Sequence, residues 1–172
     1  MLNKHIRSTV LAALFAALTT VMTMVIRVPS PMGGYVNLGD CAVLLSAWLL
    51  GPVYGCAAAG IGSMLADLLG YPLYAPGTLI IKGLMALAAG QLFTRLRRRE
   101  RPPLIPLLVS GTMGELVMVA GYFLYEAAPF PVGLGMAAAA NLPFNLVQGC
   151  FGLASAGAVY LLLFQSRQLD RL

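Results

Sequence analysis

The stretch Gly77-Thr-Leu-Ile-Ile-Lys-Gly-Leu-Met-Ala-Leu-Ala-Ala-Gly90 decides the fold, because it has the composition of a membrane helix with one lysine inside it. A charged side chain at the bilayer centre costs several kcal/mol, roughly 2.5–3.5 on insertion scales. Lys82 lies too far from either end of the stretch to reach the interface easily. We therefore expect Lys82 to meet a partner inside the protein or a bound ligand. The alternative is a salt bridge that locks two helices together.

The composition of the whole chain also indicates a membrane protein. Hydrophobic residues make up 59% of the 172 residues and charged residues only 10%, whereas soluble domains carry about 25% charged residues. The length suits one domain over residues 1–172, and about 20 apolar residues form one span. We predict an all-α integral membrane protein, a six-transmembrane-helix bundle, from the apolar runs at residues 6–27, 39–51, 52–70, 76–95, 104–126 and 134–165.

The basic residues predict the orientation of this bundle. Of the eleven Lys and Arg residues, nine fall on one side if six helices cross the membrane: Lys4, Arg7, Arg95, Arg97, Arg98, Arg99, Arg101, Arg167 and Arg171. The positive-inside rule then places both termini in the cytoplasm, whereas five helices would put the two basic termini on opposite sides. We expect a multi-pass protein of the cytoplasmic membrane of a prokaryote, with its net charge of +5 facing anionic lipid rather than nucleic acid.

Two of the runs have unusual lengths. Residues 39–51 are short for a span, since 13 residues make a helix of roughly 20 Å. Residues 134–165 are too long, and we expect Pro143 to start or kink the last helix because proline suits a first turn and disrupts an interior. That start would leave Asn141 at the outer mouth of the bundle.

Polar residues from six segments gather in the predicted outer half, which indicates a cavity that opens outward. Buried amides need partners, and a compact polar solute can supply them. Lys82 would meet an anionic or phenolate oxygen, Glu115 a protonated ring nitrogen or hydroxyl, and tyrosines the face of a ring. The candidate substrate-binding residues are Asn37, Asp40, Tyr71, Tyr74, Lys82, Glu115, Tyr122, Asn141, Asn145 and Gln148.

Several of these residues could also have ordinary structural roles. Tyr71 and Tyr74 would suit an interfacial aromatic belt. Asn141 and Asp40 could each cap the start of a helix. Glu126 is expected to be a solvated carboxylate at the end of a loop. The Pro- and Gly-rich segment 28–39 would act as a lid over the cavity or simply connect two helices.

The first helix carries two pairs of small residues, Ala12 with Ala16 and Ala13 with Ala17. Such spacing permits close approach of another helix. The partner would be a helix of the same chain or a different protein.

Metal, disulfide and enzymatic chemistry are poorly supported. The only histidine is His5, and Cys41, Cys56 and Cys150 lack the spacing of a metal site. No nucleotide-binding or hydrolase motif is present. We expect no cofactor, no metal and no enzyme activity, so any ATP hydrolysis would belong to separate subunits.

Three segments carry a resemblance to a known family: Gly34-Tyr-Val-Asn-Leu-Gly-Asp40, Leu68-Leu-Gly-Tyr-Pro-Leu-Tyr-Ala-Pro-Gly-Thr-Leu-Ile-Ile-Lys-Gly83 and Pro143-Phe-Asn-Leu-Val-Gln-Gly149. Together they resemble the substrate-binding S components of energy-coupling factor (ECF) vitamin transporters. The resemblance implies a transmembrane coupling subunit and two cytoplasmic ATPases as partners. It also implies substrate capture outside and release inside by toppling in the membrane. The alanine pairs resemble the family's AxxxA docking motif. By position, the family's pocket corresponds to Asn37, Lys82, Glu115, Asn141, Asn145 and Gln148.

The substrate implied by the resemblance is a small water-soluble vitamin or precursor. The most similar subfamily is linked to pyridoxine-type and hydroxymethylpyrimidine-type compounds, although riboflavin or a deazaguanine base would suit the same residues. Two other classes stay open. One is a six-helix scaffold subunit of the cell-shape machinery, and the other is a self-sufficient carrier or channel with Lys82 and Glu115 as an ion or proton site.

Overall fold

The computed structural model describes residues 4–30, 35–97, 103–128 and 135–166, and within them the chain is helical apart from one small hairpin. Five helices have the length and composition needed to cross a membrane. Strands β1 and β2 pair antiparallel, with Val28 opposite Val36. The elements are α1 (Lys4–Val25), β1 (Arg27–Pro29), β2 (Tyr35–Asn37), α2 (Gly39–Gly70), α3 (Ala75–Leu96), α4 (Leu104–Ala127) and α5 (Gly135–Gln165).

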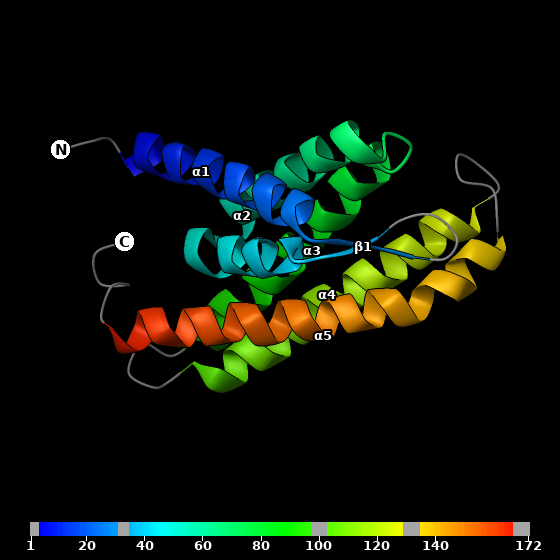
Figure 1. The fold of residues 1–172 in the computed structure, drawn as a ribbon. Coiled ribbons are helices and arrows are strands. Elements are labelled where there is room, and N and C mark those ends of the chain that lie inside the picture. Colours follow the sequence, from blue (N-terminus) through cyan, green and yellow to red (C-terminus); the bar gives the residue numbers. More distant parts are fainter. Residues whose placement is uncertain (1–3, 31–34, 98–102, 129–134, 167–172) are drawn as a thin grey trace.

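Helix α2 contains the two predicted runs 39–51 and 52–70 as one element that is broken at Gly51. Gly51 has φ 80° and ψ 177°, a conformation that is essentially restricted to glycine. Pro52 follows directly and suits the first turn of the second half. The Ser46 hydroxyl donates to the Gly55 carbonyl at 3.3 Å, so the chain folds back on itself at the break (Figure 1). The expected count of six helices thus becomes five elements, one of which reverses direction.

Helix α5 differs from the prediction at its start. It begins at Gly135, and Pro143 lies inside it. Pro143 therefore does not start the helix, and Asn141 is an interior residue rather than a cap. Asp40 is not a cap either, because the N–H of Gly39 in the first turn of α2 donates to Asn37 Oδ1 at 2.8 Å.

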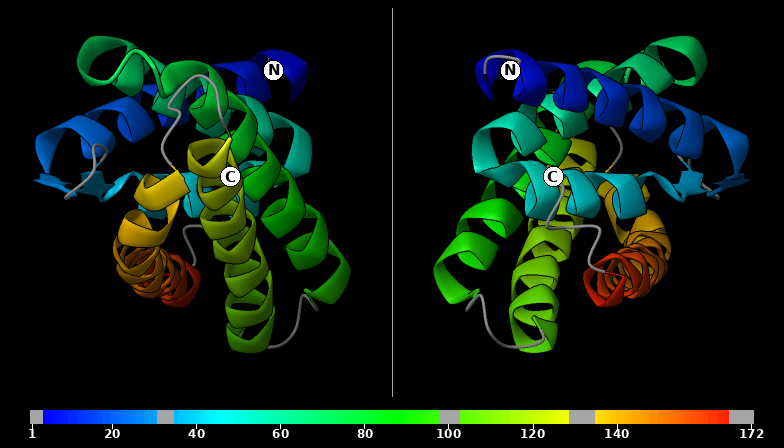
Figure 2. Two further views of the ribbon diagram at one scale, coloured as in Figure 1. Left: turned by 90° about the vertical axis from the view of Figure 1, so that its right-hand side faces the viewer. Right: turned by 90° about the vertical axis from the view of Figure 1, so that its left-hand side faces the viewer.

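The bundle has two distinct ends. Helix α1 begins and α5 ends at the end away from the hairpin (Figures 1 and 2). At that far end the rings of Trp48, Phe93 and Tyr160 pack together, with the Phe93 and Tyr160 centroids 5.4 Å apart. Leu44, Met85 and Met118 lie between the two ends and are fully buried, so the core of the bundle is apolar.

Helix α1 is the most peripheral helix, since only Thr19 and Thr23 are buried. Its predicted small pairs point in different directions. Ala16 packs on α2, where a Cβ added at Gly62 would lie 3.0 Å from Ala16 Cα. Ala13 and Ala17 are exposed. One pair therefore serves internal packing, and the other lies on an open surface.

Candidate functional site

A polar cavity lies at the hairpin end of the bundle and has a volume of about 40 Å³. Every helix and the hairpin contribute to it. Its lining consists of Thr23, Ser30, Tyr35, Asn37, Ser63, Asp67, Tyr74, Thr78, Lys82, Tyr122, Glu126, Asn141, Phe144, Asn145 and Gln148. Most of the buried polar side chains of the described residues line this cavity, so it is where polar groups of the helices converge.

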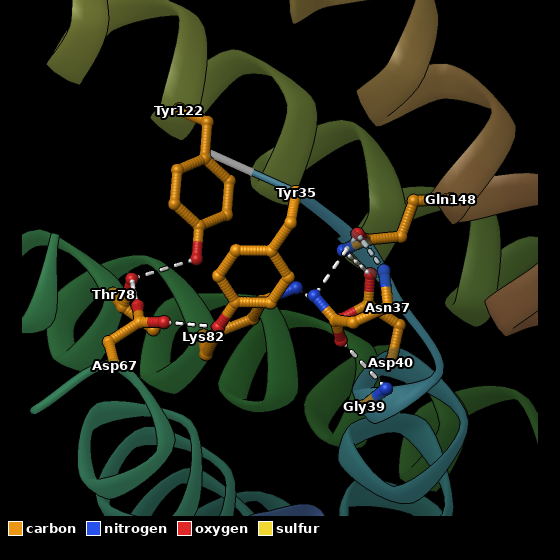
Figure 3. A network of polar contacts seen from close by, with 9 residues as sticks. All are labelled: Tyr35, Asn37, Gly39, Asp40, Asp67, Thr78, Lys82, Tyr122 and Gln148. Atoms are coloured by element: carbon orange, nitrogen blue, oxygen red, sulfur yellow. Dashed lines mark hydrogen bonds and ion pairs between the residues drawn. The ribbon is translucent and has the colours of Figure 1, made fainter. Parts of the chain in front are cut away.

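One side of the cavity is formed by a buried ion pair and by two amide side chains that are hydrogen-bonded to it in series (Figure 3). Lys82 Nζ pairs with Asp40 Oδ1, and both side chains are buried. Gln148 Nε2 donates to the other Asp40 oxygen at 2.7 Å. Gln148 Oε1 in turn accepts from the backbone N–H and the side-chain amide of Asn37, at 2.9 and 3.2 Å. The start of α2, the hairpin, α3 and α5 are thereby connected through buried polar atoms.

A second network surrounds Asp67 near the other end of α2 (Figure 3). Its carboxylate accepts from the Tyr35 hydroxyl and from Thr78 Oγ1. The Thr78 and Tyr122 hydroxyls lie 2.9 Å apart. Burial and the nearby Asp67 carboxylate raise the pKa of Tyr35 well above its ordinary value, so this phenol stays a donor. Arg27 lies over the Tyr35 ring at 4.8 Å from its centroid.

The two networks meet on α3, because Thr78 and Lys82 are one helical turn apart on the same face. Thr78 contacts the end of α2 and Lys82 contacts its beginning. Both ends of α2 therefore lie at the cavity, which requires the reversal at Gly51.

Glu126 contributes a third carboxylate to the site. It was expected to be solvated, but its residue is only 3% exposed and lines the cavity. One oxygen, Oε1, accepts from the Tyr74 hydroxyl at 3.3 Å and from Asn141 Nδ2 at 3.1 Å. The end of α4 thus faces the interior of the site.

Seven of the ten predicted substrate-binding residues line the cavity: Asn37, Tyr74, Lys82, Tyr122, Asn141, Asn145 and Gln148. The three on α5 share one face, as their spacing predicted. Asp40 is not part of the lining and pairs with the lining residue Lys82. Tyr71 is also outside the lining, and its ring centroid lies 4.8 Å from that of Tyr35.

Glu115 is the third predicted residue that does not line the cavity. It is buried but is not part of the lining, and it packs against α5. A Cβ added at Gly152 would lie 2.6 Å from Asp40 Cβ and 2.7 Å from Glu115 Oε1. The hydrogen-bonded partner of Lys82 is therefore Asp40 and not Glu115.

Eight lining residues were missing from the predicted set: Thr23, Ser30, Tyr35, Ser63, Asp67, Thr78, Glu126 and Phe144. Two of them carried a usable pattern. Thr78 precedes Lys82 by four residues and so shares its helical face, and Asp67 is a carboxylate within an apolar run, which marks a functional position by default.

Together these features define a class of protein: an apolar helical bundle of membrane-spanning composition with a polar cavity at one end. The comparisons with known proteins identify the family. Residues 3–164 match the family described as "ECF-type riboflavin transporter, S component". The chain belongs to this family of ECF S components, which are substrate-binding transport subunits rather than enzymes.

Individual proteins are also similar to this chain, and the solved structures among them share its fold. An uncharacterized protein in the gap 3′ region of Pyrococcus woesei is 36% identical over 141 residues, which cover 81% of this chain and 90% of that protein. The solved S component of a bacterial ECF transporter has a TM-score of 0.65 at 19% identity, covering 97% of this chain and 98% of its own. The S component for biotin from an ECF-type ABC transporter has a TM-score of 0.56 at 15% identity, with 93% and 94% covered.

Proposed function

We propose that this protein is the substrate-capture subunit of an ECF importer and binds a small water-soluble vitamin or vitamin precursor in the polar cavity. The observation that carries the proposal is the convergence of five helices and the hairpin on this cavity, in a chain of the S-component family. Asn145 is especially suited to a ligand, because its side chain lines the cavity and makes no hydrogen bond within the described chain.

The cavity end is proposed to face outward, with α2 crossing the membrane twice and six crossings in total. Two observations support this. Both ends of α2 reach the cavity, through Asp40 and Asp67. The start of α1 and the end of α5 lie at the opposite end, where Lys4 and Arg7 would face the cytoplasm together with the basic segments of the chain (Figure 1).

The proposed partners are a transmembrane coupling subunit, two cytoplasmic ATPases and the lipid bilayer. Ala13 and Ala17 are the proposed docking face, because they leave an exposed strip of small residues on the most peripheral helix. Large apolar side chains are exposed along all five helices, among them Leu14, Val53, Ile80, Leu116 and Phe151. Such an exterior is compatible with release by toppling, since few charges would have to cross hydrocarbon.

The proposed ligand is a single-ring hydroxylated heteroaromatic of the pyridoxine or hydroxymethylpyrimidine type. A volume of about 40 Å³ holds about three water molecules, so a small ring requires less opening than a large one. Hydroxyl and amide groups of Thr78, Tyr122, Asn145 and neighbouring residues offer both donors and acceptors to ring substituents.

Riboflavin is the second candidate, and two observations favour it. The matching family is described by that vitamin. In addition, an apolar hollow of about 500 Å³ between the hairpin and α5 shares Asn37 and Phe144 with the polar cavity. A ligand with several rings would place its polar edge in the cavity and its apolar edge in this hollow.

Binding to purified protein tests the proposal. Pyridoxine, 4-amino-5-hydroxymethyl-2-methylpyrimidine and riboflavin would be titrated by calorimetry, together with native mass spectrometry for a co-purified molecule. We expect one of them to bind, and Asn145→Ala to weaken it at least about tenfold, because a ligand group would lose its buried partner. Leu146→Ala is the matched control, since Leu146 is 48% exposed on the same helix.

Two results would contradict the proposal. One is failure of all three compounds to bind. The other is binding that Asn145→Ala leaves unchanged. Uptake in cells that lack the coupling module would instead favour a self-sufficient carrier, and a scaffold subunit would bind none of the compounds.

A further inference from the structure

The charges around the cavity do not balance. Lys82 and Asp40 neutralise each other, which leaves Asp67 and Glu126 as the remaining acidic groups of the lining. Arg27 contributes positive charge near Asp67, since it lies over the ring of Tyr35, whose hydroxyl Asp67 accepts. No described basic side chain pairs with Glu126. Glu126 is therefore the acidic group of the lining that has no basic partner among the described residues.

Asp67 and Glu126 also differ in how completely their oxygens are hydrogen-bonded. Each oxygen of Asp67 accepts a hydroxyl, one from Tyr35 and one from Thr78. Glu126 Oε1 accepts from Tyr74 and Asn141, but Glu126 Oε2 is buried and has no hydrogen-bond donor in the described part of the chain. Burial of a carboxylate oxygen without a donor is costly, and because Glu126 lines the cavity, a ligand there can supply the missing donor to Oε2.

The neutral donors beside Glu126 cannot replace a cation. Burial and the Glu126 carboxylate raise the pKa of Tyr74 well above its ordinary value, so that side chain remains a neutral phenol. Asn141 contributes a neutral amide. Residues 129–134, which follow α4 in the sequence, are Pro-Phe-Pro-Val-Gly-Leu and include no basic residue.

We propose that Glu126 is a specificity residue that binds a positively charged nitrogen of the ligand through Oε2, so that this S component prefers cationic heteroaromatics over their neutral hydroxyl analogues. This inference rests on the proposed function and names the ligand class more narrowly. A ligand with an ammonium or protonated amine at one end would give Glu126 its missing donor and neutralise its charge. The Lys82 end would then receive hydroxyl or ring-nitrogen acceptors.

Two pairs of probes of nearly equal shape test the inference. Pyridoxamine and pyridoxine differ by an aminomethyl in place of a hydroxymethyl group. The same change relates 4-amino-5-aminomethyl-2-methylpyrimidine to its 5-hydroxymethyl analogue. Calorimetry at pH 7 on the intact protein would give the affinity ratio within each pair. We expect the ammonium form of at least one pair to bind at least about tenfold more tightly, because charge-assisted hydrogen bonds are roughly twice as strong as neutral ones.

Three variants test whether Glu126 itself makes the contact with the ligand. Glu126→Gln should reduce the ratio to about one, and Glu126→Asp should restore part of it. Glu115→Gln is the matched control, since it removes a buried carboxylate of the same helix that does not line the cavity. That control should leave the ratio unchanged. Thermal unfolding of each variant in the same detergent shows that it is folded.

Each outcome has a definite meaning. Equal or tighter binding of the hydroxymethyl forms overturns the charge preference while leaving the proposed vitamin-binding function intact. A preference that survives Glu126→Gln, or that Glu115→Gln also removes, overturns the role of Glu126. If no probe and no riboflavin binds, the proposed function fails and the inference fails with it.

Discussion

Removal of the Lys82 charge is the sharpest test of how this bundle holds together. Lys82→Met keeps the length of the side chain and its apolar stem but leaves Asp40 without its cation. Asp40 is 0% exposed and keeps only the Gln148 amide as a donor. Breaking a buried pair costs about 3–5 kcal/mol, because the remaining charge is uncompensated. Since one hydrogen bond survives, we expect a loss of about 3 kcal/mol in the free energy of unfolding.

A double-mutant cycle measures the coupling energy between Lys82 and Asp40. Asp40→Asn retains an acceptor for Gln148 and removes the negative charge. In Lys82→Met combined with Asp40→Asn no unpaired charge remains, so the double variant should be more stable than Lys82→Met alone by about 2 kcal/mol. Unfolding in mixed detergent and SDS, followed by far-ultraviolet circular dichroism, gives all four free energies.

A small loss or simple additivity would refute this role of Lys82. If Lys82→Met costs less than about 1 kcal/mol, the charge of Asp40 is compensated by other groups. If the two single losses add within about 0.5 kcal/mol, the pair has no coupling. Either result would mean that Lys82 does not connect α3 to the start of α2.

Two further changes test other parts of the structure. Gly51→Ala should lower the free energy of unfolding by about 1–3 kcal/mol, because alanine is strained at φ 80° and ψ 177°. Gly157→Ala is the matched control, with equally open space around it. Equal stabilities of the two variants would contradict the reversal at Gly51. Ala13→Trp combined with Ala17→Trp should leave ligand binding intact but abolish co-purification with the coupling subunit. Leu162→Trp, at an exposed position of α5, should not affect co-purification. Retained assembly of the double variant would exclude this docking face.

Much of the site could be predicted from the sequence because helical periodicity is local. Asn141, Asn145 and Gln148 follow the period of one helical face, and they do line one cavity. Lys82 was conspicuous because a lysine in an apolar run needs a partner. The identity of that partner was not predictable, since Asp40 and Glu115 were both carboxylates in apolar runs and only the packing of α2 and α5 against α3 distinguishes them.

The burial of Glu126 was likewise not predictable from the sequence. Its position at the end of an apolar run suggested solvent, yet Tyr74 and Asn141, 52 and 15 residues away in sequence, enclose it. Contacts at such separations depend on how the helices are arranged, which no local pattern encodes.

The sequence alone therefore determined that this is a membrane protein, where most of its apolar helical runs lie, and which family it resembles. Hydrophobicity acts residue by residue, and membrane insertion requires little more than enough consecutive apolar residues. The tertiary structure decided which charges neutralise each other, that α2 reverses at Gly51, and which carboxylate of the cavity lining keeps an unpartnered oxygen. Those outcomes depend on distances of a few ångströms between distant segments, because electrostatic and hydrogen-bond energies in a buried site change steeply over that range.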